Sequence, residues 1–264
     1  MTLARLARRS GTWLPPLVVF VAVILIWEVS FLLLDVKSFL IPRPTVIWSA
    51  VVAEWPTLQR GLAYTGFEAV VGLALGVTLG TVAGLATARW ATARDALVPI
   101  GTGMSTIPII AFAPITINWF GFESQLPRIT IVALMTFFPV MVNTVRGLTQ
   151  VDPAALELMA SYAATPEAIL RRLRLPNALP YWFTALRIAV TLSVIGAVVG
   201  EFFGGPQYSI GNYVTNMTGQ FKYPNAWAAI IMACLLGISL YLVALLAERL
   251  VMPWQRRADT LSGE

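Results

Sequence analysis

Six long apolar runs constrain this chain more than any other feature of its sequence. Each has at least the roughly 17 to 25 residues that a helix needs to cross the hydrocarbon core of a bilayer. Only 12% of the 264 residues are charged and 58% are apolar, which is too little polar surface for a domain that folds in water. We therefore expect an all-α integral membrane protein, a single domain over residues 1–264, with spans at about 14–34, 62–88, 96–120, 129–145, 181–203 and 226–250.

Glycine and proline residues predict how two of these runs behave. The second run has a glycine at every fourth position from Gly72 to Gly84. Such a row lies on one helix face and lets a neighbouring backbone approach closely. The third run is expected to be kinked or broken, because it holds three prolines, which lack backbone donors: Pro99, Pro108 and Pro114.

The basic residues predict the orientation of the spans. When six spans are threaded, 13 of the 18 lysines and arginines fall on the side of the N-terminus. Cytoplasmic loops carry the excess of basic residues, so both termini are expected in the cytoplasm. The first run is too long for a signal peptide, and residues 35–44 hold no cleavage site, so we expect a retained helix. Five basic residues fall on the outer side: Lys37, Arg43, Arg60, Arg128 and Lys222.

Missing residue types exclude several kinds of chemistry. The chain has no histidine and a single cysteine, Cys234, which excludes histidine-based zinc sites, Ser-His-Asp triads and intrachain disulfides. Neither lysine follows a glycine, so the chain has no phosphate-binding Gly-Lys-Ser/Thr loop. The basic residues lie in small clusters between apolar runs, unlike those of a nucleic-acid-binding face. We expect no catalytic residue, metal site or cofactor in this chain, and no nucleic-acid partner.

The inner loop 151–180 is the longest polar stretch on its side. Asp152-Pro153 and Thr165-Pro166 are helix-start signals, a capping residue followed by proline. They predict short helices over 153–161 and 166–173, with a tight bend at Ala163-Ala164 and a stop at Pro176. These helices form either a rigid projection or a segment that lies on the membrane with its arginines among anionic headgroups.

This loop resembles the EAA loop in permease subunits of ABC importers. The matching residues are Glu157-Leu158-Met159, Ala163-Ala164 and Leu173-Arg174-Leu175-Pro176. Residues 40–44, 107–114, 118–121, 137–139 and 191–202 resemble the nitrate, sulfonate, taurine and pyrimidine-precursor branch of that family. The resemblance implies the six-helix type I ABC importer permease fold and a multi-pass protein of the bacterial inner membrane.

The resemblance also implies partners. Two permease subunits, here expected as a homodimer, would form the pathway. Two ATPase subunits would bind ATP and magnesium and each receive one loop in a groove, and an extracytoplasmic binding protein would deliver the substrate. The residues implied in ATPase coupling are Glu157, Leu158, Met159, Ala163, Ala164, Arg171, Arg172, Leu175 and Pro176.

Two features of the loop depart from the family pattern or leave alternatives open. The family has alanines where Leu158 and Met159 stand and a glycine at Ala163, where alanine is costly if the bend needs a positive φ. Glu157 would pair with an ATPase arginine or hold Arg171 or Arg172 of its own loop; alternatively it is a solvated charge.

Three carboxylates fall in the outer half of the spans: Glu28, Glu68 and Glu201. A carboxylate there is costly unless it is paired or near water. They either line the pathway, favouring a cationic or hydrogen-bond-donating ligand, or lock helix packing. Asn118, Trp119 and Asn143 are further pathway candidates, although Trp119 also suits the aromatic belt at the membrane interface.

The expected substrate is a small pyrimidine-type vitamin precursor or riboflavin, because residues 65–68 and 193–202 resemble such permeases. Sulfonate, taurine or nitrate is the alternative, disfavoured by three carboxylates and by the expected lack of lysine or arginine within the membrane. An ion-coupled secondary transporter and a membrane enzyme are the remaining classes. The inner loop argues against the first, and the missing histidine argues against the second.

Overall fold

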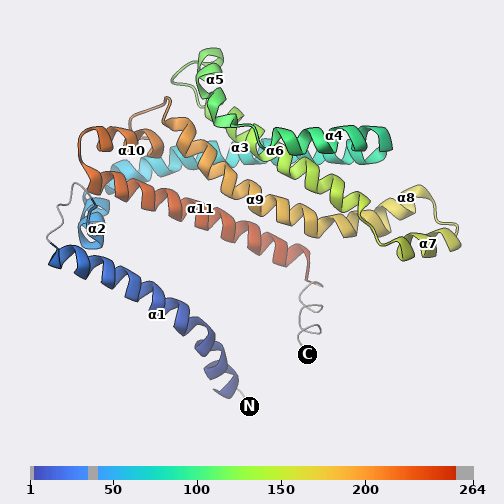
Figure 1. The fold of residues 1–264 in the computed structure, drawn as a ribbon, viewed down its shortest axis with the longest axis horizontal. Helices are drawn as coiled ribbons and strands as arrows, with labels where there is room; N and C mark the ends of the chain where they lie inside the picture. The colour runs from blue at the N-terminus through green and yellow to red at the C-terminus, as the bar shows by residue number, and fades with distance from the viewer. Residues whose placement is uncertain (1–2, 35–40, 254–264) are drawn as a thin grey trace.

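The computed structural model describes residues 3–34 and 41–253, and every regular element in them is a helix. Four long helices lie side by side and form the body of the protein (Figure 1). They are α3 (Trp55–Arg89), α6 (Leu126–Thr149), α9 (Leu175–Glu201) and α11 (Tyr223–Val251). Lys37 and two of the inner arginines used in the topology prediction, Arg256 and Arg257, lie outside the described residues.

Helix α1 (Leu3–Leu33) diverges from this body (Figure 1). It meets the rest of the chain at one end, where it contacts α2 (Pro44–Ala53) and where Trp27 packs edge-on against Trp227 of α11. None of its span Pro15–Leu33 is buried within the chain. A helix that is this apolar and this uncovered belongs in lipid or against another membrane-embedded surface.

The predicted spans agree with the helices in number and differ at their ends. Five helices are long and apolar enough to cross a membrane, and one bent pair would supply the sixth. The second span begins earlier than predicted, at Trp55, and the fifth ends at Glu201, so Phe203 lies beyond it. Helix ends depend on capping and packing, which hydropathy does not report.

The third span is broken, as its prolines predicted. It consists of α4 (Ala91–Met104), the short 3₁₀ helix η1 (Ile109–Phe112) and α5 (Ala113–Phe120). The two halves differ in direction by 78°. Pro108, which has no N–H to donate, precedes η1 with ψ at 77°, outside the helical range.

The glycine row of α3 packs against α6, as the spacing predicted. A Cβ on Gly72 would lie 2.5 Å from Val132 Cβ, and one on Gly80 would lie 2.6 Å from the Phe137 carbonyl oxygen. A Cβ on Gly76 would overlap Thr136. The row therefore sets how closely the two central helices approach.

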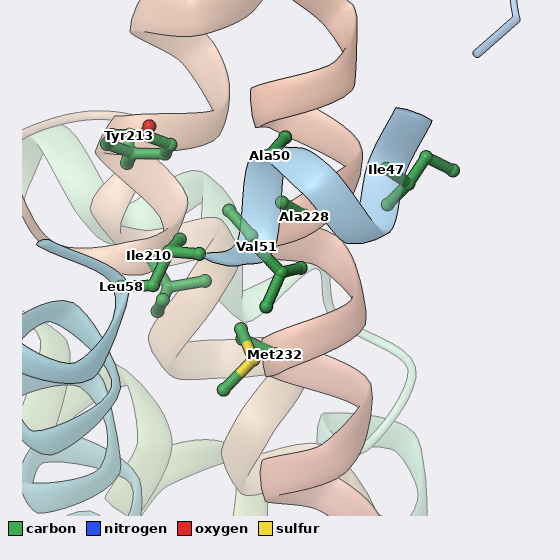
Figure 2. Close-up of a cluster of buried hydrophobic side chains, with 9 residues drawn as sticks. Ile47, Ala50, Val51, Leu58, Ile210, Tyr213, Ala228 and Met232 are labelled. Atoms are coloured by element: carbon green, nitrogen blue, oxygen red, sulfur yellow. The ribbon is translucent and has the colours of Figure 1, made fainter. Parts of the chain in front are cut away.

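The two ends of the bundle carry different short helices (Figure 1). The loop end carries α7 (Pro153–Ser161), α8 (Pro166–Ile169) and the π-helical turn η2 (Leu170–Arg174). The cap end carries α2, α10 (Ile210–Gly219) and the connection from α5 to α6. Figure 2 shows the buried apolar cluster that joins α2, α3, α10 and α11 at the cap end, including Ile47, Val51, Leu58, Ile210 and Met232.

The prediction that Pro176 ends the second loop helix is wrong. The helical path runs without interruption from Pro166 through α8, η2 and α9 to Glu201, over 36 residues. In η2 the Leu175 N–H donates to the carbonyl of Leu170, five residues back. This wider turn keeps the backbone helical although Pro176 has no N–H to donate. The loop and the fifth span therefore form one helix.

Candidate functional site

The loop at 151–180 forms two capped helices, as the sequence predicted. An Asp152 carboxylate oxygen accepts from the Ala154 N–H at 3.0 Å, and Thr165 Oγ1 accepts from the Ala168 N–H at 3.3 Å. Helix α7 has the predicted bounds, Pro153–Ser161. The capping side chains satisfy donors that a helix start leaves unpaired, so the loop is ordered by its own sequence.

The bend between the two loop helices adopts the conformation that is costly for alanine. Ala163 has φ at 51°, in the left-handed region, and the Ala164 N–H donates to the Met159 carbonyl at 3.0 Å to close the turn. A side chain with a Cβ pays about 1–2 kcal/mol in this region. The loop therefore keeps the sharp turn without the glycine that would suit it.

The outer surface of the loop mixes charge with exposed apolar side chains. Leu158 is 57% exposed and Tyr162 is 77% exposed, beside the exposed Glu157. Arg171 pairs at 2.7 Å with Glu167, one turn earlier in its own helix, which disfavours the alternative in which Glu157 holds Arg171. Among the described residues Glu157 forms no ion pair, and its carboxylate faces solvent on a surface with apolar neighbours.

The root of the loop is fastened to the fourth span. The Asn177 side-chain amide donates to the carbonyl oxygens of Gly147 at 2.8 Å and Gln150 at 3.0 Å, at the end of α6. Gly147 permits this approach, because a Cβ there would lie 2.7 Å from the Cα of Ala178. A force on the loop therefore reaches both α6 and α9.

A buried ion pair lies at the cap end. Arg128 Nε donates to Glu68 Oε1 at 2.9 Å, and neither side chain is exposed. Arg128 also donates to the Tyr64 hydroxyl at 3.0 Å and to the carbonyls of Gly204 at 3.3 Å and Phe122 at 3.4 Å. An arginine is stable inside a helix bundle only when its N–H groups are hydrogen-bonded and its charge is paired with an opposite charge, as here.

This pair contradicts one expectation. Arg128, expected on the outer side before the fourth span, is the third residue of α6 and is fully buried, so the expected lack of a basic residue within the spans is wrong. Two features of the sequence could have indicated a buried arginine. Arg128 directly precedes the apolar run that begins at Ile129, and the second span contains a carboxylate, Glu68, that could pair with it. Periodicity could not reveal the pairing, because Glu68 is 60 residues away.

The other two carboxylates hold helix starts. Glu201 accepts from the Thr65 hydroxyl at 2.7 Å and from the Gly211 N–H at 2.6 Å, at the first turn of α10. Glu28 of α1 accepts from the Thr45 N–H at 3.1 Å and its hydroxyl at 2.8 Å, at the first turn of α2. A carboxylate at a helix N-terminus satisfies donors and complements the helix dipole. These contacts favour the alternative in which the carboxylates lock helix packing.

The remaining pathway candidates fall in different surroundings. Asn118 lines an open hollow of about 760 Å³ together with Phe122 and Phe203. Trp119 is 70% exposed. Asn143 donates to the Pro139 carbonyl of its own helix at 2.8 Å. Of the three, Asn118 is the one that the structure places in a hollow.

A second hollow, of about 680 Å³, runs between α9 and α11. Its lining is almost wholly apolar, as at Val194, Ile195 and Ile238, and includes the exposed Cys234. A groove of this composition on the outside of a membrane bundle suits acyl chains. It offers few polar groups to recognise a water-soluble substrate.

Comparison with known proteins agrees with this architecture. Residues 76–257 match the family described as "Binding-protein-dependent transport system inner membrane component". The chain is 34% identical to the formylaminopyrimidine transport permease protein of Halalkalibacterium halodurans, over 95% of this chain and 99% of that one. It is 29% identical to the riboflavin transport system permease protein of Chloroflexus aurantiacus, over 90% and 89% of the two chains.

Two more distant similarities also cover most of the chain. A putative aliphatic sulfonates transport permease protein of Bacillus subtilis is 28% identical over 94% of this chain and 90% of its own length. The crystal structure of an amino acid ABC transporter matches 75% of this chain and 96% of that one, with a TM-score of 0.59 at 17% identity. The latter similarity shows the type I permease fold.

Proposed function

The chain belongs to the family of binding-protein-dependent transport system inner membrane components and is an ABC importer permease subunit; we propose that it carries a pyrimidine-type vitamin precursor or riboflavin. A separate ATPase, bound at the α7–α8 loop, would drive transport by alternating access. Its relatives are transport permeases, so the chain is a multi-pass inner membrane protein and is not itself an enzyme. Membership of this family also excludes the alternative in which the chain is an ion-coupled secondary transporter.

The unbroken helix from Pro166 to Glu201 is the observation that carries the proposed mechanism. At about 1.5 Å per residue, 36 residues span roughly 54 Å. One end lies in the loop and the other among the cap-end contacts, where Glu201 holds the start of α10. A movement imposed on the loop would tilt α9 as a lever and alter the cap end, as switching between two packed states requires.

The proposed assembly contains two copies of this chain, two ATPase subunits and an extracytoplasmic binding protein. The loop end would face the cytoplasm, since arginines gather there at the helix ends and on the loop, as at Arg89, Arg146 and Arg172. The ATPase subunits would bind ATP and magnesium. The binding protein would then meet the cap end, on the opposite side of the membrane.

Two observations support a neutral heteroaromatic substrate. Relatives named for formylaminopyrimidine and riboflavin share 34% and 29% identity with nearly the whole chain. In addition, the buried charge of Arg128 is met by Glu68, so it is not available to an anion. The 28% identity to a sulfonate permease keeps aliphatic sulfonates as the second candidate.

Coupling is tested by reconstituting the permease in liposomes with its ATPase and binding protein and measuring ATP-dependent uptake. We expect Glu157→Arg to lower ATPase binding and uptake at least tenfold, because it reverses the charge on the exposed loop surface. Asp95→Arg is the matched control, an exposed carboxylate of α4 that lies outside the loop and away from the cap end. Uptake without the ATPase, or equal effects of the two variants, would refute the coupling role.

The substrate is tested in the same liposomes with three labelled compounds: a formylaminopyrimidine, riboflavin and an aliphatic sulfonate. We expect uptake of one of the first two, with ATP and the binding protein both required. Uptake of the sulfonate alone would overturn the proposed substrate while leaving the importer function intact.

A further inference from the structure

The hollow at the cap end combines two aromatic side chains with one amide. Phe122, from the connection before α6, and Phe203, just beyond α9, line it together with Asn118 of α5. Its volume of about 760 Å³ falls in the range of small-molecule sites. Within the described residues the exposed Asn118 amide makes no hydrogen bond, so its two N–H donors and its carbonyl acceptor are free to bind a ligand.

The buried guanidinium of Arg128 holds the backbone beside both aromatic walls of the hollow, Phe122 and Phe203, in place. Arg128 Nη1 donates to the carbonyl oxygens of Phe122 and of Gly204, which directly follows Phe203. The Phe122 ring also rests on Gly204, where an added Cβ would lie 2.8 Å from Phe122 Cε2. Glu68 and Tyr64 of α3 fix the guanidinium in turn. The ion pair thus sets the distance between the walls.

The chemistry of the hollow selects a class of ligand. Aromatic walls favour a flat ring, because offset or edge-on ring contacts add to the burial of apolar surface. A side-chain amide can pair with a ring nitrogen and an adjacent amino group at the same time, as asparagine does with adenine. The nearest buried cation is already paired with Glu68, so the hollow lacks the charge that a sulfonate would need.

We infer that this hollow is a substrate subsite for neutral, flat nitrogen heterocycles, in which Asn118 reads the edge of the ring and Phe122 and Phe203 contact its faces. Arg128 acts as a positioning residue that holds the two walls. The inference rests on the proposed transport function and specifies where in the chain the substrate is recognised. Because Phe203 follows the end of α9, movement of the lever would open or close the hollow.

The first test measures substrate taken up per ATP hydrolysed by the complete reconstituted importer, with riboflavin and a formylaminopyrimidine as probes. This ratio does not depend on how much protein folds. We expect Asn118→Ala and Phe122→Leu each to lower it at least tenfold. Gln59→Ala and Phe67→Leu are matched controls, since both residues are exposed on α3 outside the hollow, and we expect no change from them.

The second test separates wall placement from the ion pair. Gly204→Ala pushes against the Phe122 ring and leaves Arg128 and Glu68 in place, so we expect the ratio to fall as it does in Phe122→Leu. Gly103→Ala is the control, because a Cβ there meets nothing within 4 Å. Arg128→Lys keeps the charge but cannot reach both wall carbonyls, so it should lower the ratio while retaining a folded importer.

A labelling experiment gives an independent measurement. In a Cys234→Ala background, we expect riboflavin or the pyrimidine to slow the thiol labelling of Asn118→Cys but not that of Gln59→Cys. Uptake of either heterocycle with an unchanged ratio in Asn118→Ala, or labelling that no substrate slows, overturns this subsite alone. Uptake of only the sulfonate overturns both the subsite and the proposed substrate.

Discussion

Arg128 of α6 and Glu68 of α3 are joined by a hydrogen-bonded ion pair of 2.9 Å, with both side chains fully buried at the cap end of the bundle. The same arginine contacts the carbonyls that precede α6 and follow α9. One cation therefore connects three of the four central helices. Its cost of desolvation is met only while all of these partners stay in place.

We predict that breaking this pair destabilises the protein strongly. Glu68→Ala would leave the Arg128 charge buried without a counter-charge and should cost about 3–5 kcal/mol of unfolding free energy. The double variant Glu68→Leu with Arg128→Met should recover at least half of the loss, because apolar groups then replace both charges. Denaturant unfolding of the purified protein in detergent measures both, and a single variant as stable as wild type would contradict the prediction.

The glycine row on α3 yields a prediction about helix spacing. Gly76→Ala places a Cβ 2.5 Å from the Ala133 carbonyl oxygen on α6 and should destabilise the bundle by roughly 1–3 kcal/mol through overpacking. Gly103→Ala, in a helix but with open space around it, should be neutral or slightly stabilising. Thermal unfolding of the two variants in parallel gives the comparison, and equal shifts would show that close packing is not the cause.

The bend of the loop predicts a stabilising substitution. Ala163→Gly removes the left-handed strain at φ 51° and should stabilise the loop by about 1 kcal/mol. Ala164→Gly, at a position without a positive φ, should instead weaken the loop by adding freedom to the unfolded chain. Hydrogen exchange of the α7 amides reports the result: slower exchange is expected in the first variant and faster exchange in the second.

The amide of Asn177 predicts a variant that transports less substrate for each ATP hydrolysed. Asn177→Ala removes both hydrogen bonds to the end of α6, which should cost about 1–3 kcal/mol and loosen the root of the lever. We expect uptake per ATP hydrolysed to fall severalfold while the loop still binds the ATPase. Asn216→Ala is a control on α10, at the other end of the bundle. An unchanged ratio in Asn177→Ala would show that this contact is not part of the coupling.

Much of the loop could be predicted from the sequence because its determinants are local. Asp152 and Thr165 cap helices within two or three residues of themselves, and the bend at Ala163 is closed by backbone hydrogen bonds that span three to five residues. The continuation through Pro176 could not be predicted, because proline usually ends a helix and the wider turn at η2 compensates for it here.

The sequence by itself determined that this chain crosses a membrane, about where its spans lie, where the third breaks and which face of the second packs closely. Those properties follow from run length, proline and glycine spacing within single helices. Only the tertiary structure decided that Arg128 lies inside the bundle against Glu68, 60 residues away, and that Glu201 binds Thr65 across 136 residues. The partner of a buried charge is set by how the folded helices pack, because the cost of desolvating the charge is offset only where a partner of opposite charge lies in contact with it.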